Sequence, residues 1–479
     1  MNAQPRTPSV LWALIPVVTL MGLLALAYGL YGDDAASGAN QIALLFSALV
    51  AVAIGWLHGF NWQEMGEAAR DSVTTGIGAI FILLAVGSLI GTWAMSGTLI
   101  AMVYWGLQVL SPDYFYFTVV LICALVALCV GSSWTVAGTL GIGLMGVADQ
   151  MDLNPAITAG AIISGAYFGD KSSPLSDATN LATAAVGADL YEHIVETLWT
   201  SVPTLVLALF FFWLMGSPAD FDASNITSGI AQEFDVSILP FLPLLLVLVL
   251  ALLRYPPFVT IFLGALAGGV IAVIIAPDHV VSLADDPDLP FALAMIKGVW
   301  TAMANGYVST SGSETLDTFL SRGGMSSMLV TIWLILTALA FGGVIERIGV
   351  LDRLLKPILK AANTTGRLIS ALVASALATN ILASDQYIAI VLPGRVFQKP
   401  FQRLKLAPQV LSRAVGDSAT VTSALVPWNS CGAYMAATLG VATISYAPFA
   451  LFNLINPIIT IVFAFAGIRM IKEDPPLPE

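Results

Sequence analysis

Long apolar runs alternate with short polar segments along most of the chain. The longest runs are residues 11–30, 41–57, 201–215, 238–253 and 258–275. Several approach the roughly 20 residues that an α-helix needs to cross about 30 Å of hydrocarbon. The pattern therefore predicts an all-α polytopic membrane protein with roughly 10–14 transmembrane segments, forming a single integral membrane domain over residues 1–479.

Composition agrees with a lipid environment. Hydrophobic residues make up 58% of the chain and charged residues 10%, whereas soluble domains carry about a quarter charged residues. The first apolar run follows Arg6 and contains Ala25-Leu26-Ala27, which resembles the cleavage site of a secretory signal. The run is too long for a signal and more runs follow, so we interpret it as the first membrane span.

Positive and negative charges fall in different loops. Basic residues gather in two groups: Arg347, Arg353, Lys356, Lys360 and Arg367, and then Arg395, Lys399, Arg403, Lys405 and Arg413. The other basic residues of this set are Arg6, Arg70, Arg254, Arg469 and Lys472. Other loops are acidic: Asp33, Asp34, Asp220, Asp222, Glu233, Asp235, Asp278, Asp285, Asp286 and Asp288. Because basic loops stay in the cytoplasm, we expect both termini to be cytoplasmic. Lys297 and Arg322 fit neither group.

Two apolar stretches are interrupted by glycine, proline and polar residues. The first, residues 129–181, opens with a serine-containing break at Ser132 and closes with Gly169-Asp170, hydroxyl residues and Pro174. The second, residues 380–432, opens at Ser384 and closes with Gly416-Asp417 and a similar polar segment. The matching order predicts internal repeats with broken helices. We place the two halves at about 73–216 and 326–471.

Four aspartates in these stretches are candidate ion or proton sites: Asp170, Asp177, Asp385 and Asp417. A carboxylate at membrane depth costs about 3 kcal/mol unless it is paired, protonated or solvated, so such residues usually have a function. Asp177 and Asp385 could instead cap helix N-termini near the interface. Lys171 could pair with a carboxylate or extend to the interface.

Oxygen donors surround these aspartates. The supporting polar ligands that we expect are Ser132, Ser133, Ser173, Thr179, Asn180, Ser418, Thr420 and Asn429. Soft ligands are not clustered, because the three cysteines and three histidines are isolated from one another. The pattern predicts a sodium site formed by Asp170, Asp177, Asn180, Asp417 and Asn429, with no cofactor, no catalytic residues and no nucleic-acid partner.

Such a site can couple two ions. A buried carboxylate prefers to be neutral; a bound proton removes its charge and a bound cation offsets it. If the site crosses the membrane readily only when neutralised, sodium moves one way and protons the other.

Four motifs resemble the NhaC family of sodium/proton antiporters. They are GAYFGDKSSPLSDATNLA at residues 165–182, GSSWT at 131–135, SDQY with PGR at 384–387 and 393–395, and VPWNSCGA at 426–433. The resemblance implies the ion-transporter fold, with inverted repeats whose re-entrant hairpins and broken helices meet near the bilayer midplane. It also implies exchange of cytoplasmic sodium for external protons. We expect the protein in a bacterial or archaeal cytoplasmic (inner) membrane, and a homodimer is one arrangement that we consider there.

The sequence differs from the family pattern at two positions, and two other functions are considered beside sodium/proton exchange. Ser172 and Ala178 stand where the family often has methionine and threonine. Relatives that exchange malate for lactate leave a sodium-coupled organic anion exchanger as the alternative. An intramembrane aspartyl protease would also use paired Gly-Asp segments. Its Gly-x-Gly-Asp pattern is broken here by Tyr167 and Ala414, so we expect no enzyme activity.

Overall fold

The computed structural model describes residues 6–472, except 217–226, 229, 232–235, 310–316, 318–319 and 362. These residues form helices joined by short turns, and their one β-type contact is an isolated bridge between Leu406 and Lys472. The all-α class is therefore confirmed. The predicted acidic loop residues Asp220, Asp222, Glu233 and Asp235 lie outside the described residues.

The N-terminal part of the fold ends with a long helix of 25 residues. Its helices are α1 (Val10–Tyr31), α2 (Ala39–Leu57), α3 (Trp62–Thr75), α4 (Ile77–Met95), α5 (Thr98–Val109), α6 (Phe115–Val130), α7 (Ser133–Val136), α8 (Ile142–Gln150), α9 (Pro155–Ser172), α10 (Asp177–Val186) and α11 (Leu190–Leu214). A π-helical turn, Ala137–Gly141, joins α7 to α8.

Among the described residues, four helices separate this part from the C-terminal part: α13 (Leu242–Leu252), α14 (Pro257–Ile275), α15 (Pro277–Ala284) and α16 (Phe291–Asn305). The C-terminal helices are α18 (Leu329–Arg347), α19 (Val350–Ala361), α20 (Thr365–Leu382), α21 (Gln386–Arg403), α22 (Pro408–Val415), α23 (Ser430–Leu439), α24 (Thr443–Tyr446) and α25 (Leu451–Ala466). A second π-helical turn, Gly416–Thr420, follows α22 directly.

Eight of the described helices are long and apolar enough to cross a membrane, and the bent pair Thr443–Phe449 and Leu451–Ala466 would make nine. This is fewer than the number of spans expected from the sequence. Two further apolar helices, Thr98–Val109 and Leu239–Leu252, are short. Helices α9 and α21 have 18 residues each but carry the polar residues of the broken stretches. The polytopic architecture is confirmed.

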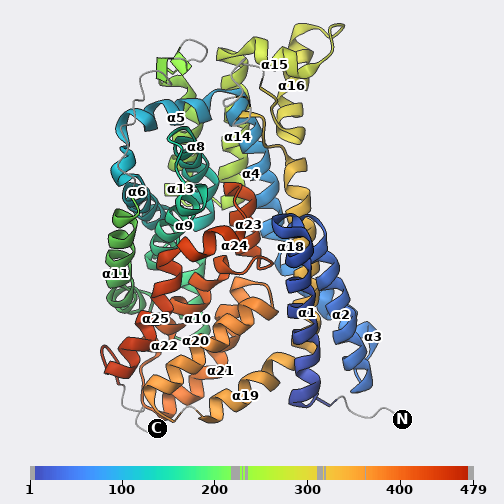
Figure 1. Ribbon diagram of the computed structural model, residues 1–479, viewed down its shortest axis with the longest axis vertical. Helices are drawn as coiled ribbons and strands as arrows, with labels where there is room; N and C mark the ends of the chain where they lie inside the picture. The colour runs from blue at the N-terminus through green and yellow to red at the C-terminus, as the bar shows by residue number, and fades with distance from the viewer. Residues whose placement is uncertain are drawn as a thin grey trace.

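The two broken stretches fold in the same order. In the first, α6 ends at Gly131 in a left-handed conformation, the chain turns into α7, and α9 ends at a second break before α10. In the second, α20 ends before Ser384, which is also left-handed (φ 61°), and a second break precedes α23. Helix α4 runs away from the lower end of the molecule and α18 runs toward it (Figure 1). These two helices begin the two predicted halves and run in opposite directions, as inverted halves would, and the halves stay a prediction.

Helix α9 packs very closely against α6. A Cβ added at Gly165 would meet the Val120 carbonyl oxygen at 2.4 Å, and one added at Gly169 would meet the Leu128 backbone nitrogen at 2.4 Å. Small residues four apart let two membrane helices approach in this way. The pairing fixes the end of α9, which carries Asp170 and Lys171.

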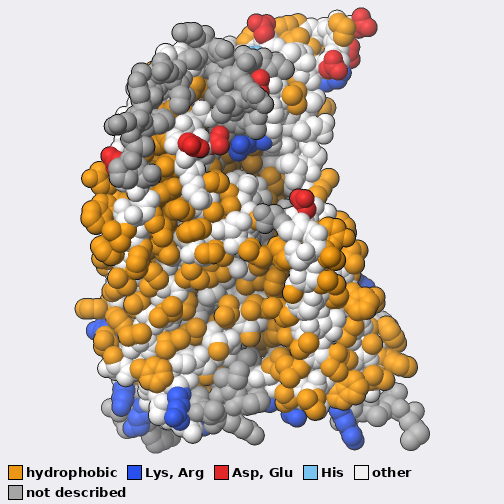
Figure 2. Space-filling view, in the orientation of Figure 1, with side chains coloured by type: hydrophobic (Ala, Val, Ile, Leu, Met, Phe, Trp, Pro, Cys, Tyr) orange, Lys and Arg blue, Asp and Glu red, His pale blue; other side chains and the backbone are white. Residues whose placement is uncertain are grey.

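The surface has an apolar middle and oppositely charged ends. Hydrophobic side chains cover the centre of the face in Figure 2, basic residues gather at the lower end, and acidic residues gather toward the upper end. Lys297, which fitted neither group, lies 3.0 Å from Asp286, and this hydrogen bond lowers the pKa of the Asp286 carboxyl. We expected Arg413 in a basic cytoplasmic loop, but this was wrong, because its side chain is fully buried.

Candidate functional site

The breaks in the two stretches surround a cavity of about 890 Å³. Its wall includes three of the predicted carboxylates, Asp170, Asp177 and Asp385. The wall also includes the start of α4 and the turn between α13 and α14, which contributes Arg254. The cavity therefore lies between the broken helices and a separate group of membrane helices.

Four helices begin at this cavity: α7, α10, α21 and α23. Each has an N-cap side chain that accepts a hydrogen bond from a backbone N–H in its first turn, and these caps are Ser132, Ser176, Asp385 and Asn429. Ser132 and Ser176 belong to the first half of the chain, and Asp385 and Asn429 belong to the second. The positive ends of four helix dipoles are thus directed to one region of the protein interior.

Asp170 is held at the cavity wall by both breaks of the first half. Asn154 caps α9, Pro155 occupies its first turn, and Asp170 lies in its last turn. The Ser133 backbone N–H and hydroxyl donate to one carboxylate oxygen at 3.1 and 2.6 Å, and the Ser176 hydroxyl donates to the other at 2.5 Å. Among the described residues no lysine or arginine pairs with Asp170.

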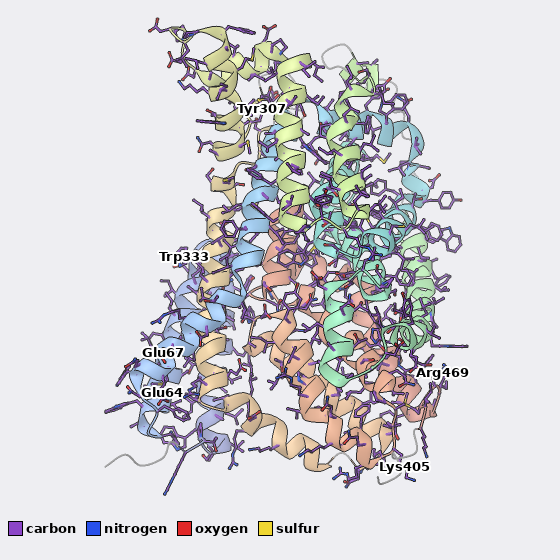
Figure 3. The ribbon with its side chains drawn as sticks, turned by 180° about the vertical axis from the view of Figure 1, so that it is seen from behind. Glu64, Glu67, Tyr307, Trp333, Lys405 and Arg469 are labelled. Atoms are coloured by element: carbon purple, nitrogen blue, oxygen red, sulfur yellow. The ribbon has the colours of Figure 1, made fainter. Side chains whose placement is uncertain are left out.

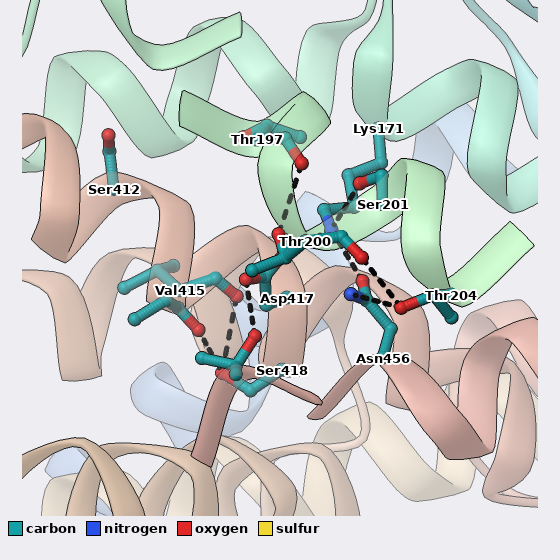
Figure 4. Close-up of polar contacts among 12 residues, drawn as sticks. Lys171, Thr197, Thr200, Ser201, Thr204, Ser412, Val415, Asp417, Ser418 and Asn456 are labelled. Carbon is teal, nitrogen blue, oxygen red and sulfur yellow. Dashed lines mark hydrogen bonds and ion pairs between the residues drawn. The ribbon is translucent and has the colours of Figure 1, made fainter. Parts of the chain in front are cut away.

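Lys171, the next residue on α9, belongs to a different environment. Its ammonium forms an ion pair with Asp417 and also donates to the Asn456 side-chain oxygen and to Ser201 at 2.9 Å (Figure 4). Lys171 and Asp417 are at most 2% exposed. Of the two alternatives for Lys171, the structure has the internal ion pair.

Asp417 lies in the second π-helical turn, a distortion that is frequent at functional sites. Besides Lys171, it accepts hydrogen bonds from Thr200 at 3.0 Å and from Thr460. It is absent from the cavity wall. Asp417 therefore lies apart from the cavity that Asp170, Asp177 and Asn180 line, and the sodium site stays a prediction.

The other predicted residues fall into three groups. Asp177, Asn180, Ser132 and Ser133 line the cavity. Ser173 and Thr179 are buried behind it, and Asn429 bonds to Asn380 at 3.1 Å as well as capping α23. Ser418 donates back to the Ala414 carbonyl at 2.6 Å, and Thr420 is buried. Ser418 thus has the ordinary helix back-bonding role of a buried hydroxyl.

An aromatic pair beside the cavity joins α7 of the first half to α23 of the second half. Trp134 of α7 stacks on Tyr434 of α23 with ring centroids 4.0 Å apart. The Tyr434 hydroxyl also donates to the Trp134 carbonyl at 2.8 Å. This contact connects helices that are far apart in sequence.

Sequence reasoning missed a second set of buried polar residues on α11, among them His193, Glu196 and Thr200. Their spacing along an otherwise apolar helix was the available signal. Glu196 pairs with Arg413 at 3.1 Å and with Arg469. Arg254 on the cavity wall was assigned only to the cytoplasmic side.

Comparison with known proteins assigns the family. Residues 165–468 match the family model described as the Na+/H+ antiporter family. The Na(+)/H(+) antiporter NhaC of Alkalihalophilus pseudofirmus is 37% identical, covering 91% of this chain and 92% of its own length. The arginine/ornithine antiporter ArcD of Halobacterium salinarum is 32% identical, with coverages of 98% and 94%. The malate-2H(+)/Na(+)-lactate antiporter of Bacillus subtilis is also 32% identical, with 89% for both. The chain belongs to the Na+/H+ antiporter family, as its motifs predict.

Proposed function

We propose that this protein exchanges cytoplasmic sodium for external protons as a secondary active transporter without a cofactor. The observation that carries the proposal is Asp170, a buried carboxylate on a cavity wall with three hydrogen-bond donors and no basic partner among the described residues. A carboxylate in such a place binds either a proton or a cation. Because the two ions compete for it, one leaves when the other enters.

The neighbouring oxygens suit sodium. Asp177 and Asn180 lie on the same cavity wall as Asp170. The Ser133 and Ser176 hydroxyls donate to the carboxylate in this structure, and each also has lone pairs that it can turn to a cation. Asp170 and Asp417 share no hydrogen bond, which argues against the carboxylate dyad of an aspartyl protease.

We place the lower, basic end of the molecule in the cytoplasm, because cytoplasmic loops carry the excess of lysine and arginine. The start of α1 and the end of α25 lie at this end (Figure 1). Both termini would then be cytoplasmic, in the inner membrane of a bacterium or archaeon. A homodimer stays a prediction of the sequence.

A sodium-coupled exchanger of organic anions is the second candidate. The cavity of about 890 Å³ is far larger than a sodium ion. Arg254 and the N-termini of four helices could hold a carboxylate there. Two relatives are named as antiporters of organic substrates.

The test uses the purified protein in proteoliposomes with an imposed pH gradient. Sodium should dissipate the gradient in the wild type and in the control Asp286→Asn, which changes an exposed carboxylate far from the cavity. Asp170→Asn should lose the response, because its amide cannot be charged. Robust sodium-dependent exchange in Asp170→Asn would exclude the proposed site. Sodium-dependent uptake of labelled malate or lactate would favour the second candidate.

A further inference from the structure

We propose that protons travel between the basic end of the protein and Asp417 along the polar face of α11, separately from the cavity that serves Asp170. The inference rests on the proposed function. It adds to the competition at Asp170 a second proton-binding group, the Lys171–Asp417 pair, which has its own route to water.

One face of α11 is polar over several turns. Its residues are His193, Glu196, Thr197, Thr200, Ser201 and Thr204, and each is at most 2% exposed. The other face is apolar and exposed, with Val195, Leu198, Trp199, Val202 and Val206. Their spacing of three and four residues is that of one helical face. A membrane helix with this arrangement turns its polar face into the protein, where it lines a polar path.

The path begins at the surface. Glu196 accepts hydrogen bonds from Arg469, whose side chain is 36% exposed, and from buried Arg413 at 3.1 Å. Figure 3 shows Arg469 near the same end of the molecule as Lys405. Glu196 is therefore a buried titratable group in contact with a partly exposed residue at the basic end.

Further buried polar groups adjoin Glu196 on α11. The His193 ring nitrogens lie 2.8 Å from the Ser412 hydroxyl and 3.3 Å from the Thr197 hydroxyl. The Nε and Nη2 groups of Arg413 are buried without a hydrogen-bond partner among the described residues. Buried donors of this kind are usually satisfied by water, and water between them would carry protons past the threonine hydroxyls.

The inner end of the path is the Lys171–Asp417 pair. Thr200 donates to Asp417 at 3.0 Å, and Ser201 accepts from Lys171 at 2.9 Å (Figure 4). The charged or titratable groups around Asp417 are Lys171 of α9, Arg413 of α22, His193 and Glu196 of α11, and Arg469 beyond α25. Loss of one proton from the pair leaves a neutral lysine beside the carboxylate, and its return restores the ion pair.

The two routes meet at α9. Asp170 and Lys171 are consecutive in its last turn, yet one lies on the cavity wall and the other contacts Asp417. A movement of this turn on cation binding therefore changes the contact of Lys171 with Asp417. This gives a physical link between sodium at one carboxylate and the proton at the other.

The experiment compares two transport modes in proteoliposomes. Exchange of labelled sodium for sodium at equal pH needs no proton transfer, whereas sodium/proton exchange does. Thr200→Val removes the hydroxyl beside Asp417, and His193→Gln keeps hydrogen bonding without a titratable ring. Both should slow sodium/proton exchange about tenfold or more, while sodium/sodium exchange stays within about twofold.

The controls separate the possible failures. Thr337→Val removes a buried hydroxyl that donates to carbonyls within α18, and it should change neither mode. Thr200→Ser should keep both modes, and Asp170→Asn should lose both. Two outcomes would overturn the route. In the first, Thr200→Val loses both modes equally while Thr200→Ser stays active. In the second, Thr200→Val and His193→Gln leave sodium/proton exchange unchanged. If Thr200→Val does not fold, His193→Gln decides. If the wild type shows neither mode, the proposed function itself fails.

Discussion

Asp170 and Lys171 show how strongly one residue's environment can differ from its neighbour's. Asp170 has three hydrogen-bond donors and no ionic partner among the described residues, while Lys171 is paired with Asp417 and bonded to two further oxygens. An unpaired charge is far more costly in the interior than a paired one. The first residue is thus suited to bind a mobile ion, and the second is already neutralised.

Removing one partner of the buried pair should be strongly destabilising. Lys171→Met leaves the Asp417 charge buried without its counter-ion, which typically costs about 3–5 kcal/mol. The double variant Lys171→Met/Asp417→Leu should recover most of that stability, because no isolated charge remains. Thermal unfolding in detergent measures both. A double variant as unstable as the single one would mean that packing, not charge, explains the loss.

Asp385 has a local structural role that can be tested apart from transport. Its side chain accepts a hydrogen bond from the Ile388 backbone N–H at 3.0 Å and caps α21. Asparagine caps a helix about as well as aspartate, whereas alanine loses about 1 kcal/mol. We expect Asp385→Asn to keep stability and exchange, and Asp385→Ala to lose stability. Loss of sodium exchange in a stable Asp385→Asn protein would instead make Asp385 an ion ligand.

At the scale of elements, the site depends on helices that stop inside the protein. Four N-caps satisfy the backbone groups that the breaks expose, and Asn453 donates to the Val421 carbonyl at 2.8 Å beside the second π-helical turn. Backbone interrupted at membrane depth is tolerated only when it is buried in protein or lines a cavity. Both conditions are met here.

The close packing of α9 against α6 fixes the position of Asp170 in the last turn of α9. A Cβ on Gly169 would clash with backbone atoms of α6, so Gly169→Ala should push α9 outward, destabilise the protein by about 1–3 kcal/mol and reduce exchange. Gly22→Ala on α1 is the matched control, because an added Cβ there meets nothing within 4 Å. Unfolding midpoints and transport rates of the two variants test this. Equal behaviour of the two would refute close packing at Gly169.

The whole molecule has opposite charges at its two ends and an apolar band between them (Figure 2). This arrangement predicts its orientation in the membrane. In a cysteine-free background, Lys405→Cys should react with a membrane-impermeant thiol reagent only from the cytoplasmic side. Asp286→Cys should react only from the outside. Labelling of both from one side would reject the proposed topology.

Local information was enough for much of this protein. Hydropathy predicted the membrane helices, because each helix in lipid must satisfy its own backbone hydrogen bonds. Glycine, proline and capping residues predicted the breaks, and the motif strings predicted the family. The candidates Asp170, Asp177 and Asn180 lie at the cavity as their shared motif suggested.

Only the tertiary structure decided which charges meet. Lys171 and Asp417 are 246 positions apart, and Arg413 and Glu196 are 217 apart. No local pattern shows whether a lysine such as Lys171 extends to the interface or binds a distant carboxylate, because the neighbouring apolar sequence is the same in either case. The polar face of α11 likewise acquires its meaning only when α9, α22 and α25 pack against it. Pairing depends on the distance between side chains from different helices, and that distance is a property of the packed fold.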